Sequence, residues 1–592
     1  MPPVAAVAVA LIAAQLAVRA VLAFGGYFYW DDLILVGRAG TQPLLSATYL
    51  FNDHDGHLMP AAFLFGGVIT RLAPLNWMWP AASLLVMQLI ASLALLRTLH
   101  IILGWRRVLL VPLAFALFTP LAVPSFAWWA AALNYLPMLA ALAWVCGDAV
   151  LLIRTGNSRY ALTGVLAYLA GLVFFEKAAV IPFVAFAVAA LLHHVGGDAG
   201  GDSTPLRSVW RAGLKLWVPA SVLTVVWVGL YLTVVDQQRW SGDIMMTWDL
   251  LSRSVTHGIV PGLIGGPWHW QRWAPASPWA VPGPAAMALG WAALLVVVAV
   301  TLVRKQRIGW VWLSALGYVV ACQVPIYLMR SSAFTALELA QTLRYLADLV
   351  WVLALLAAVG LCAPNRAASH WLDASAGRSA VVGALVLGFL ASSLVSTRTF
   401  LTSWQDNPTK AYLHNAIRGL AQARAESPAP MLDQEVDPLI LQRVVGPENL
   451  ASHMFALLSD RPDFERYTSE LRMLDNRGAL VDADVTWVRR TVPGPQSQCG
   501  YLVAPDFPAR MPLDGPLLPA EWTAEVNYLA NTEGSVVMSL PDGPETRVAV
   551  KPGLNRAYVR LSGAGDAITV RAATTALSVC IASGPVGFLA PR

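Results

Sequence analysis

Apolar stretches of about twenty residues recur along the first two thirds of the chain and constrain its fold more than any other feature. A helix of this length and composition can cross the hydrocarbon core of a bilayer. Hydrophobic residues make up 57% of the 592 residues and charged residues only 13%, with a mean hydropathy of +0.58. Soluble domains carry about 25% charged residues. The sequence therefore predicts a polytopic α-helical membrane protein with about eleven transmembrane helices.

The apolar stretches give the positions of these helices. We expect them near 4–24, 79–97, 108–123, 131–153, 160–175, 178–194, 214–235, 284–303, 309–328, 345–362 and 380–397. The segment from Met1 to Phe24 lacks a basic start and is expected to be a retained helix rather than a cleaved signal peptide.

The charges of the connecting loops predict the orientation. One alternating set of loops holds Arg97, Arg106, Arg107, Arg154, Arg159, Arg207, Arg211, Lys215, Arg304, Lys305, Arg307, Arg366 and Arg378, against the acids Asp198, Asp202 and Asp373. Because basic loops stay in the cytoplasm, the N-terminus is expected there. An odd number of spans then places the C-terminal part outside the cytoplasmic (inner) membrane.

The composition changes after about residue 399. Residues 1–399 are expected to form the transmembrane domain, and 400–592 an extracytoplasmic mixed α/β domain that is β-rich from about 520. Short runs at 537–540, 546–550, 557–561, 568–572 and 576–582, with a turn at 563–565, suggest a terminal β-sandwich. Cys499 and Cys580 are a plausible disulfide in an oxidising exterior.

Two adjacent carboxylates, Asp31 and Asp32, follow the first apolar stretch directly. Repulsion and partial burial can raise the pKa of one of them toward that of a working general base. A transferase uses such a base to deprotonate an acceptor hydroxyl. The alternatives are a solvated helix end or a partner for a basic residue such as Arg19.

The segment 52–57, Asn-Asp-His-Asp-Gly-His, places two acids and two imidazoles in the same long outer loop. If it is extended, Asp53, Asp55 and His57 share one side and could bind a divalent cation. With His54, they could also bind a phosphate-bearing substrate. A hydrophilic turn that bonds its own backbone explains the segment equally simply. Upstream, Leu33 to Leu50 could form a helix on the membrane surface.

Several other polar groups fall in the outer loops. Lys177, Arg330 and Arg344 are candidates for binding a phosphate, and Glu176 and Tyr345 stand beside them. Trp128, Trp129 and Asn134 could complete a wet cleft. Solvated helix ends or an aromatic belt at the membrane interface are the alternatives.

With Asp31-Asp32 after the first helix, about eleven helices and an outward C-terminal domain, the chain resembles the GT-C superfamily of membrane glycosyltransferases. The resemblance implies an inverting transfer of sugar from a polyprenyl-phosphate donor to a glycan or glycolipid acceptor of the cell envelope. It places the general base on Asp31 or Asp32. The C-terminal domain could bind the acceptor carbohydrate or simply shield the catalytic cleft. No WWDYG-type run is present, which disfavours an oligosaccharyltransferase.

Other functions are weighed against this one. A transporter or flippase of lipid-linked sugars would be expected to carry ionisable residues near the bilayer midplane. Asp148 and Asp348 lie toward helix ends instead, which disfavours transport. Another membrane transferase acting on phospholipids is also an alternative. The net charge of +5 is spread along the chain without a basic tract, so no nucleic-acid partner is expected. No cofactor is required, although a divalent cation is compatible with the acids.

Overall fold

A computed structural model of the chain describes residues 2–196, 205–236, 242–366 and 375–592, although the side chains of 205 and 375–379 are not described. Asp198, Asp202, Asp373 and the side chain of Arg378, used in the topology argument, lie outside this description. The chain divides into two compact units, Met1–Asn407 and Pro408–Arg592. The boundary therefore lies just after the last helix of the first unit, whereas composition alone placed it inside that helix.

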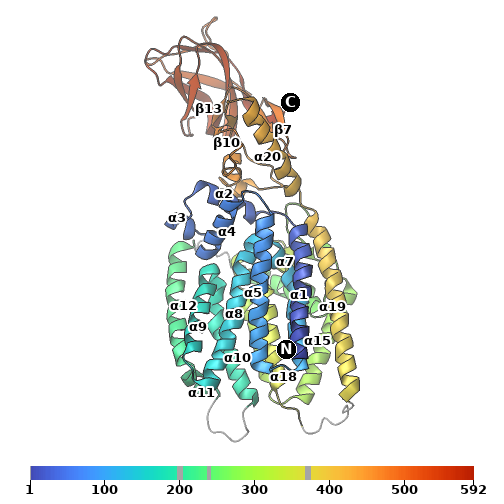
Figure 1. The fold of residues 1–592 in the computed structure, drawn as a ribbon. Helices are drawn as coiled ribbons and strands as arrows, with labels where there is room; N and C mark the ends of the chain where they lie inside the picture. Colours follow the sequence, from blue (N-terminus) through green and yellow to red (C-terminus); the bar gives the residue numbers. More distant parts are fainter. Residues whose placement is uncertain (1, 197–204, 237–241, 367–374) are drawn as a thin grey trace. The chain divides into compact units, whose positions relative to one another are not determined.

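The first unit is a bundle of helices, each predicted apolar stretch coinciding with helical structure (Figure 1). The matching elements are α1 (Pro3–Gly25), α5 (Met78–Leu103), α6 (Leu110–Phe118) with α7 (Val123–Ala127), α8 (Trp129–Thr155), α9 (Arg159–Phe174), α10 (Ile181–Gly196), α12 (Leu214–Val234), α15 (Pro284–Arg304), α16 (Gly309–Arg330), α18 (Ala347–Cys362) and α19 (Ser375–Gln405).

Within the described ranges, eight helices are long and apolar enough to cross a membrane, or nine if one bent pair counts as a single span. The bent pair joins the α6 and α7 segments at 43°. Pro120 has no backbone N–H to continue the helix there. The helices α9 and α18 are apolar but have only 16 residues each. These helices are compatible with a multi-pass membrane protein.

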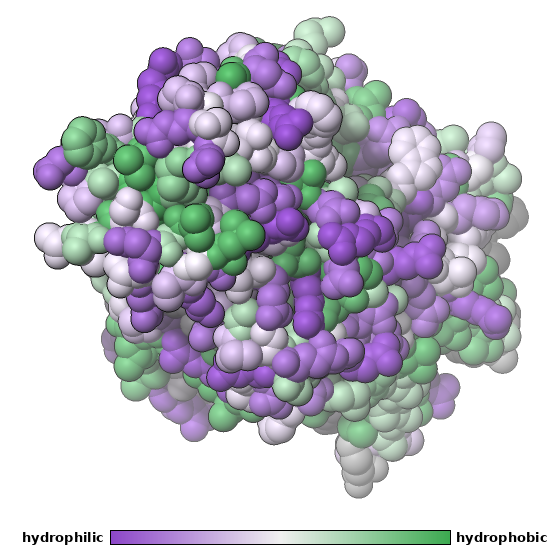
Figure 2. All heavy atoms as spheres, turned by 90° about the horizontal axis from the view of Figure 1, so that it is seen from above, coloured by the Kyte–Doolittle hydropathy of each residue, from purple (hydrophilic) through white to green (hydrophobic). Residues whose placement is uncertain are grey.

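The outward faces of the bundle are apolar, unlike the surface of a soluble protein. In α15 only Ala286 and Gly290 are buried, while Leu295, Val296 and Val303 are at least 60% exposed. Exposed apolar stripes of this length need lipid or another apolar partner to cover them. Figure 2, seen from above, shows hydrophilic and hydrophobic residues mixed over that face of the molecule.

Short helices gather at one end of the bundle. Figure 1 shows α2 (Asp31–Thr41), α3 (Ala47–Leu50) and α4 (Pro60–Leu72) at this end, and α11 (Pro205–Ala212) at the other. The expected surface helix from Leu33 to Leu50 is wrong in two respects. It is divided between α2 and α3, with Pro43 in the break. Its residues Leu33 to Val36 are also at most 4% exposed, so α2 packs inside the protein.

Further short elements connect the spans. They are η1 (Arg107–Leu109), η2 (Pro120–Ala122), η3 (Glu176–Val180), α13 (Ile244–Arg253), the π-helical turn η5 (Ser254–Ile259), α14 (Val260–Gly262), β1 (Trp270–Gln271), β2 (Trp279–Ala280) and α17 (Glu338–Gln341). The strands β1 and β2 pair with each other.

The second unit begins with α20 (Thr409–Glu426) and is otherwise rich in strands. Its main sheet orders β12 (Thr546–Val550), β11 (Gly534–Ser539), β13 (Gly553–Ala572), β10 (Ala509–Ala530), β14 (Val579–Ile581) and β9 (Tyr501–Val503). Three short strands extend it: β5 (Tyr467–Thr468), β8 (Arg489–Arg490) and β15 (Pro585–Gly587). The smaller elements are β3 (Met431–Leu432), η7 (Arg443–Val445), α21 (Ala451–Met454), β4 (Phe464–Glu465), β6 (Arg472–Leu474), β7 (Leu480–Val485) and β16 (Leu589–Pro591).

The long antiparallel pair β10–β13 organises this unit. The predicted turn at 563–565 is wrong, because the runs 557–561 and 568–572 are the two ends of the single strand β13. Gly563 and Gly565 have φ values of 117° and 140°, which let the strand bend without breaking its pairing with β10. The inward residues of β10 to β14 form one hydrophobic core that includes Trp522, Val559 and Ile568.

Candidate functional site

Polar residues from six separate segments meet at the α2 end of the bundle. They are Asp31 at the start of α2, His54 to His57 between α3 and α4, Trp128 before α8, Glu176 and Lys177 in η3, Arg330 at the end of α16, and Arg344-Tyr345 before α18. Hydrogen bonds, ion pairs and ring contacts link most of these residues to one another, as described below. The residues singled out from the sequence are therefore largely brought together, and the fold places them on one polar rim.

The two adjacent aspartates have different environments. Asp32 is fully buried, and its two carboxylate oxygens accept backbone N–H bonds from Tyr29 at 2.9 Å and Ala130 at 2.8 Å. Burial raises the pKa of Asp32 well above its usual range, although the two N–H groups oppose this. Asp31 keeps 30% of its side chain exposed. Asp31 is thus the carboxylate that a substrate can reach, and Asp32 ties the start of α2 to the start of α8.

His54 faces Asp31 without bonding to it. Its Nε2 atom lies 4.0 Å from Asp31 Oδ1, too far for a hydrogen bond, and has no hydrogen-bond partner among the described residues. Burial lowers the pKa of His54, so the imidazole is neutral near pH 7. A buried ring nitrogen and an accessible carboxylate therefore flank the same small space.

Backbone strain is concentrated at this rim. Three non-glycine residues with positive φ flank its charged groups: Trp30 at 44° before Asp31, Asp55 itself at 52°, and Leu343 at 57° before Arg344. Such conformations cost about 1–3 kcal/mol each and persist where the surrounding structure imposes them, often at functional sites. The sequence gives no signal for a positive φ at Trp30 or Leu343, because bulky residues rarely adopt this backbone conformation.

Arginines and aromatic rings alternate along the rim. The Arg344 guanidinium lies 5.1 Å from the Trp128 ring centroid and 4.9 Å from that of Tyr345, and it donates to the Tyr345 hydroxyl at 2.7 Å. Among the described residues no carboxylate lies within ion-pairing distance of Arg344. Arg330 stacks over Tyr345 at 5.6 Å and pairs with Asp55 at 3.2 Å. Arg344 therefore offers a positive charge to an anionic ligand.

The sequence argument missed Arg272, which extends this row. Its guanidinium lies 5.2 Å from the Tyr29 ring and 5.5 Å from the Trp404 ring, and Tyr29 in turn packs against Trp128 at 4.9 Å. In the sequence, Arg272 lies in a loop that contains Trp268, Trp270, Trp273 and Trp279, which is only a weak signal for a functional residue. Of those tryptophans, Trp268 and Trp270 are hydrogen-bonded to α19 through Ser392 and Ser396.

The expected divalent-cation site at Asp53, Asp55 and His57 is not formed. Asp53 accepts from the backbone N–H of Gly56, Asp55 pairs with Arg330, and His57 Nδ1 lies 2.7 Å from Glu176 Oε1. Within the described part of the chain no group of three such ligands converges. The turn conformation, with Asp55 and Gly56 at positive φ, sends the three side chains to different partners.

Lys177 is committed to an internal ion pair and does not offer a free cation. Its Nζ lies 2.8 Å from Asp348 Oδ1, and the Tyr318 hydroxyl donates to the other oxygen of Asp348 at 2.7 Å. Asp348 is fully buried, so this network joins η3, α16 and α18 in the interior. Lys177 therefore differs from Arg344, which has no carboxylate partner among the described residues.

The remaining predicted residues are all buried, but they differ in whether their polar atoms are hydrogen-bonded. Trp129 is fully buried and donates to Ser83 Oγ, so it cannot stack on a substrate. Asn134 is 6% exposed, and its side-chain oxygen has no hydrogen-bond partner among the described residues. Trp128 is also 6% exposed, with its indole nitrogen likewise unpaired.

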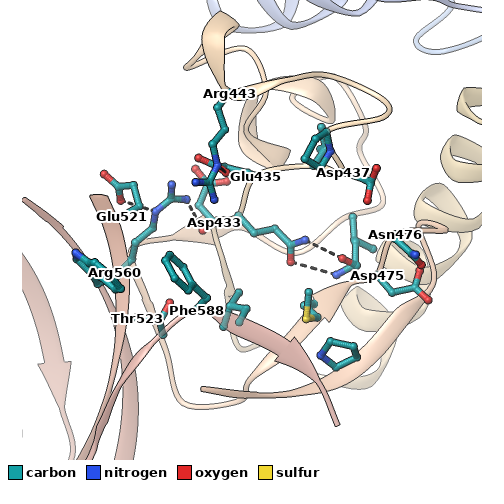
Figure 3. A pocket seen from close by; sticks show the side chains of 18 residues that line it. Asp433, Glu435, Asp437, Arg443, Asp475, Asn476, Glu521, Thr523, Arg560 and Phe588 are labelled. Atoms are coloured by element: carbon teal, nitrogen blue, oxygen red, sulfur yellow. Dashed lines mark hydrogen bonds and ion pairs between the residues drawn. The ribbon is translucent and has the colours of Figure 1, made fainter. Parts of the chain in front are cut away.

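The second unit contains a separate cavity of about 510 Å³ (Figure 3). Its walls carry five carboxylates and two arginines, namely Asp433, Glu435, Asp437, Asp475, Glu521, Arg443 and Arg560. Arg560 reaches between Glu521 Oε2 at 2.7 Å and the Asp433 carbonyl at 2.6 Å. Phe588 is 40% exposed and packs its ring on Trp522 at 4.8 Å. The cavity therefore offers an aromatic surface bordered by hydrogen-bonding groups.

The two cysteines of this unit are joined. Cys499 and Cys580 form a disulfide with a Cα–Cα distance of 4.7 Å, and Cys580 lies in β14. Cys146 and Cys322 are buried free thiols in the bundle.

A comparison with protein-family models finds no match, and a comparison with curated proteins finds no similar sequence. The function is therefore argued from the geometry of the rim and of the cavity.

Proposed function

We propose that this chain is a GT-C-type membrane glycosyltransferase that moves a sugar from a polyprenyl-phosphate donor to a glycan or glycolipid acceptor of the cell envelope. The observation that carries the proposal is the accessible Asp31 carboxylate, which lies beside neutral His54 on a rim that also holds Arg344. A base and a cation at the end of an apolar bundle suit a substrate with a lipid tail and a charged head.

The proposed reaction is a single displacement with inversion. The Asp31 carboxylate takes the proton of the acceptor hydroxyl while that oxygen attacks the anomeric carbon of the donor. The bond from the anomeric carbon to the phosphate oxygen breaks, and the lipid phosphate leaves with the electron pair. Arg344, assisted by Arg330, stabilises the charge on the leaving phosphate. Asp32 holds Asp31 in place and does not itself exchange a proton with substrate.

In this proposal all eleven apolar helices span the cytoplasmic membrane. Of the two 16-residue helices, α18 is mostly buried within the bundle, whereas α9 exposes Leu162 and Leu166 to the apolar surroundings. The basic loops lie in the cytoplasm, together with the N-terminus. The rim and the second unit lie outside, where the prenyl-linked donor presents its head group. Donor lipids and acceptor glycan are the expected partners, and no metal is required by the mechanism.

We assign the cavity of the second unit to a saccharide, as the acceptor-binding site. A sugar ring places its C–H face on an aromatic side chain, here the exposed face of Phe588. Its hydroxyls donate to carboxylates such as Asp437 and Asp475 and accept from Asn476 or an arginine. Most carboxylates of the wall accept internal hydrogen bonds already, which fixes their orientation before a ligand binds.

The test is sugar transfer in membranes from a panel of labelled polyprenyl-phosphate sugars. Asp31→Asn is expected to lower the rate by about 10²–10⁴-fold without changing expression or unfolding temperature. Glu338→Gln, which changes an exposed carboxylate of the loop before α18, is the matched control. Full activity of Asp31→Asn rejects the base assignment. Movement of lipid-linked sugar across liposomes without any transfer would favour a flippase instead.

The role of Arg344 is tested separately. Arg344→Gln is expected to reduce transfer by about 10–100-fold, the loss of a charge-assisted hydrogen bond to phosphate. The loss should appear for every prenyl-phosphate sugar alike, because the phosphate is common to them all. A loss confined to one sugar would assign Arg344 to the sugar rather than to the phosphate.

A further inference from the structure

The bundle buries an arginine, Arg19, that the proposed reaction does not use. Arg19 of α1 is only 3% exposed, and Gln15, one helical turn earlier, is 1% exposed. Both belong to the packed stripe of α1 with Ala8, Ile12 and Leu22. Sequence alone suggested Arg19 as a partner for Asp31 or Asp32. The structure gives it neither, since Asp32 bonds only backbone N–H groups and the nearest basic group recorded for Asp31 is His54.

These two polar side chains lack partners within the described part of the chain. Arg19 makes no hydrogen bond or ion pair there, and both polar atoms of the Gln15 amide are buried and unbonded. The contact that Arg19 does make is with the ring of Phe126, whose centroid lies 4.8 Å from its guanidinium carbon. A cation–π contact leaves the N–H donors of a guanidinium unsatisfied. A buried charge in this state is strongly destabilising.

Arg19 and Gln15 line the same small cavity. Its other walls are Leu117 and Phe118 at the end of α6, Val123 of α7, Val18 of α1, and Leu394 and Thr397 of α19. The centre of a water-sized sphere can move through about 10 Å³ inside it, which leaves room for one small ion. The carbonyl end of α6 borders it but accepts no hydrogen bond from Arg19. The cavity thus combines one positive charge and free N–H donors with space for a single atom.

We infer that this cavity is a binding site for a monatomic anion, with chloride as the natural occupant. A halide accepts several N–H bonds at once, so it can take donors from both Arg19 and Gln15. It also compensates the buried charge, which a neutral water does not. Phosphate, carboxylates and lipid head groups carry more atoms than the cavity holds. The bound anion would join α1 to the bent α6–α7 segment and to α19, and so stabilise the first unit.

The experiment measures the unfolding temperature of the purified full-length chain in detergent micelles. Sodium chloride or bromide replaces sodium gluconate at constant ionic strength. A saturable rise of about 2–4 °C is expected with either halide. The rise should vanish in Arg19→Met, and Gln15→Leu should shift its midpoint several-fold to higher halide. Arg107→Gln, which changes an exposed arginine, is the control and should respond as the native chain does.

Three results would overturn the inference. One is a native chain whose unfolding temperature is the same in halide and gluconate, which would leave a neutral water as the occupant. Another is an equal rise with inorganic phosphate, which would indicate a polyatomic anion elsewhere. The third is a full halide response in Arg19→Met. If that variant does not fold, an anomalous bromide peak between Arg19 and Gln15 in crystals of the native chain decides the question, and a peak elsewhere contradicts it.

Discussion

The two units differ in where they keep their charges. Two aspartates of the first unit are fully buried in ion pairs, Asp348 beside Lys177 and Asp148 beside Arg97. The second unit has ion pairs at its surface, such as Arg510–Asp566 and Arg592–Asp484, whose side chains are more than half exposed. Exposed pairs contribute about 0–1 kcal/mol, whereas breaking a buried pair leaves an uncompensated charge.

This difference separates two sources of stability. In the second unit, a large hydrophobic core and a disulfide hold the long strands together, so its surface charges can change at little cost. In the first unit, an apolar outer surface and packed helices inside leave few alternatives for a charge that has lost its partner. The same environment strengthens the electrostatic interactions available to the rim.

The largest effect is expected from breaking the buried pair. Lys177→Met leaves the Asp348 carboxylate without a cation and should lower the free energy of unfolding by about 3–5 kcal/mol. Thermal unfolding in micelles measures this. The double variant Lys177→Met/Asp348→Leu should recover much of the loss, because no buried charge remains. Equal stability of Lys177→Met and the native chain would mean that the pair is not buried as described.

Removing the disulfide tests the stability of the second unit, for comparison with the buried ion pair of the first. Cys499→Ser with Cys580→Ser opens a link across 81 residues and should destabilise the second unit by about 2–4 kcal/mol. Amide hydrogen exchange should accelerate in β9 and β14 and stay unchanged in the helices of the first unit. Acceleration in both units would show that they unfold together, and the contrast between them would then fail.

The two aspartates sharpen the comparison within the rim. Asp32→Asn replaces an acceptor of two backbone N–H bonds by a side chain that can accept only through its oxygen, and should cost about 2 kcal/mol of stability. Asp31→Asn is the matched control and should leave the unfolding temperature unchanged. The reverse order, with Asp31 the more costly to replace, would exchange the positioning and catalytic roles proposed above.

The smallest expected effect is the pH dependence of stability that comes from His57 and Glu176. Burial lowers the pKa of His57, but the nearby Glu176 carboxylate and Asp55 outweigh burial and Arg330, so the folded-state pKa lies above 6.5. The stabilisation from His57–Glu176 is therefore complete below about pH 6.5 and is lost as the pH rises through the raised pKa. Thermal unfolding at about pH 5.5 and about pH 8.5 should differ by less than about 1 kcal/mol from this pair. Glu176→Gln should reduce that difference, and an unchanged difference would assign it to other groups.

Much of the fold could be read from the sequence, because apolar length predicts helices directly. The eleven predicted stretches all coincide with helices, but length alone did not show that two of them are too short for an ordinary span. Strand prediction was weaker: β10 was missed, since Pro512, Gly515 and Pro516 interrupt its pattern. The bend at Gly563 and Gly565 was taken for a turn. Both errors arise because pairing between distant strands overrides local signals.

For the candidate site, the sequence supplied residue types but not their environments. It marked Asp31-Asp32, the 52–57 segment and the loop arginines, yet it could not say which aspartate is accessible. That depends on the position of α8, because the backbone N–H of its Ala130 donates a hydrogen bond to the Asp32 carboxylate. It also could not exclude a cation site at Asp53, Asp55 and His57, since the partners that draw these side chains apart come from distant segments.

The sequence by itself determined that the chain has an apolar helical part followed by a β-rich part, because hydropathy and turn residues act locally. Only the tertiary structure decided which charges are paired, which are accessible and which are buried without a partner. Arg19 shows this most clearly: in the sequence it is one basic residue near the end of an apolar helix. In the fold it faces Phe126 and a cavity of one atom's size, because helices from distant parts of the chain close around it.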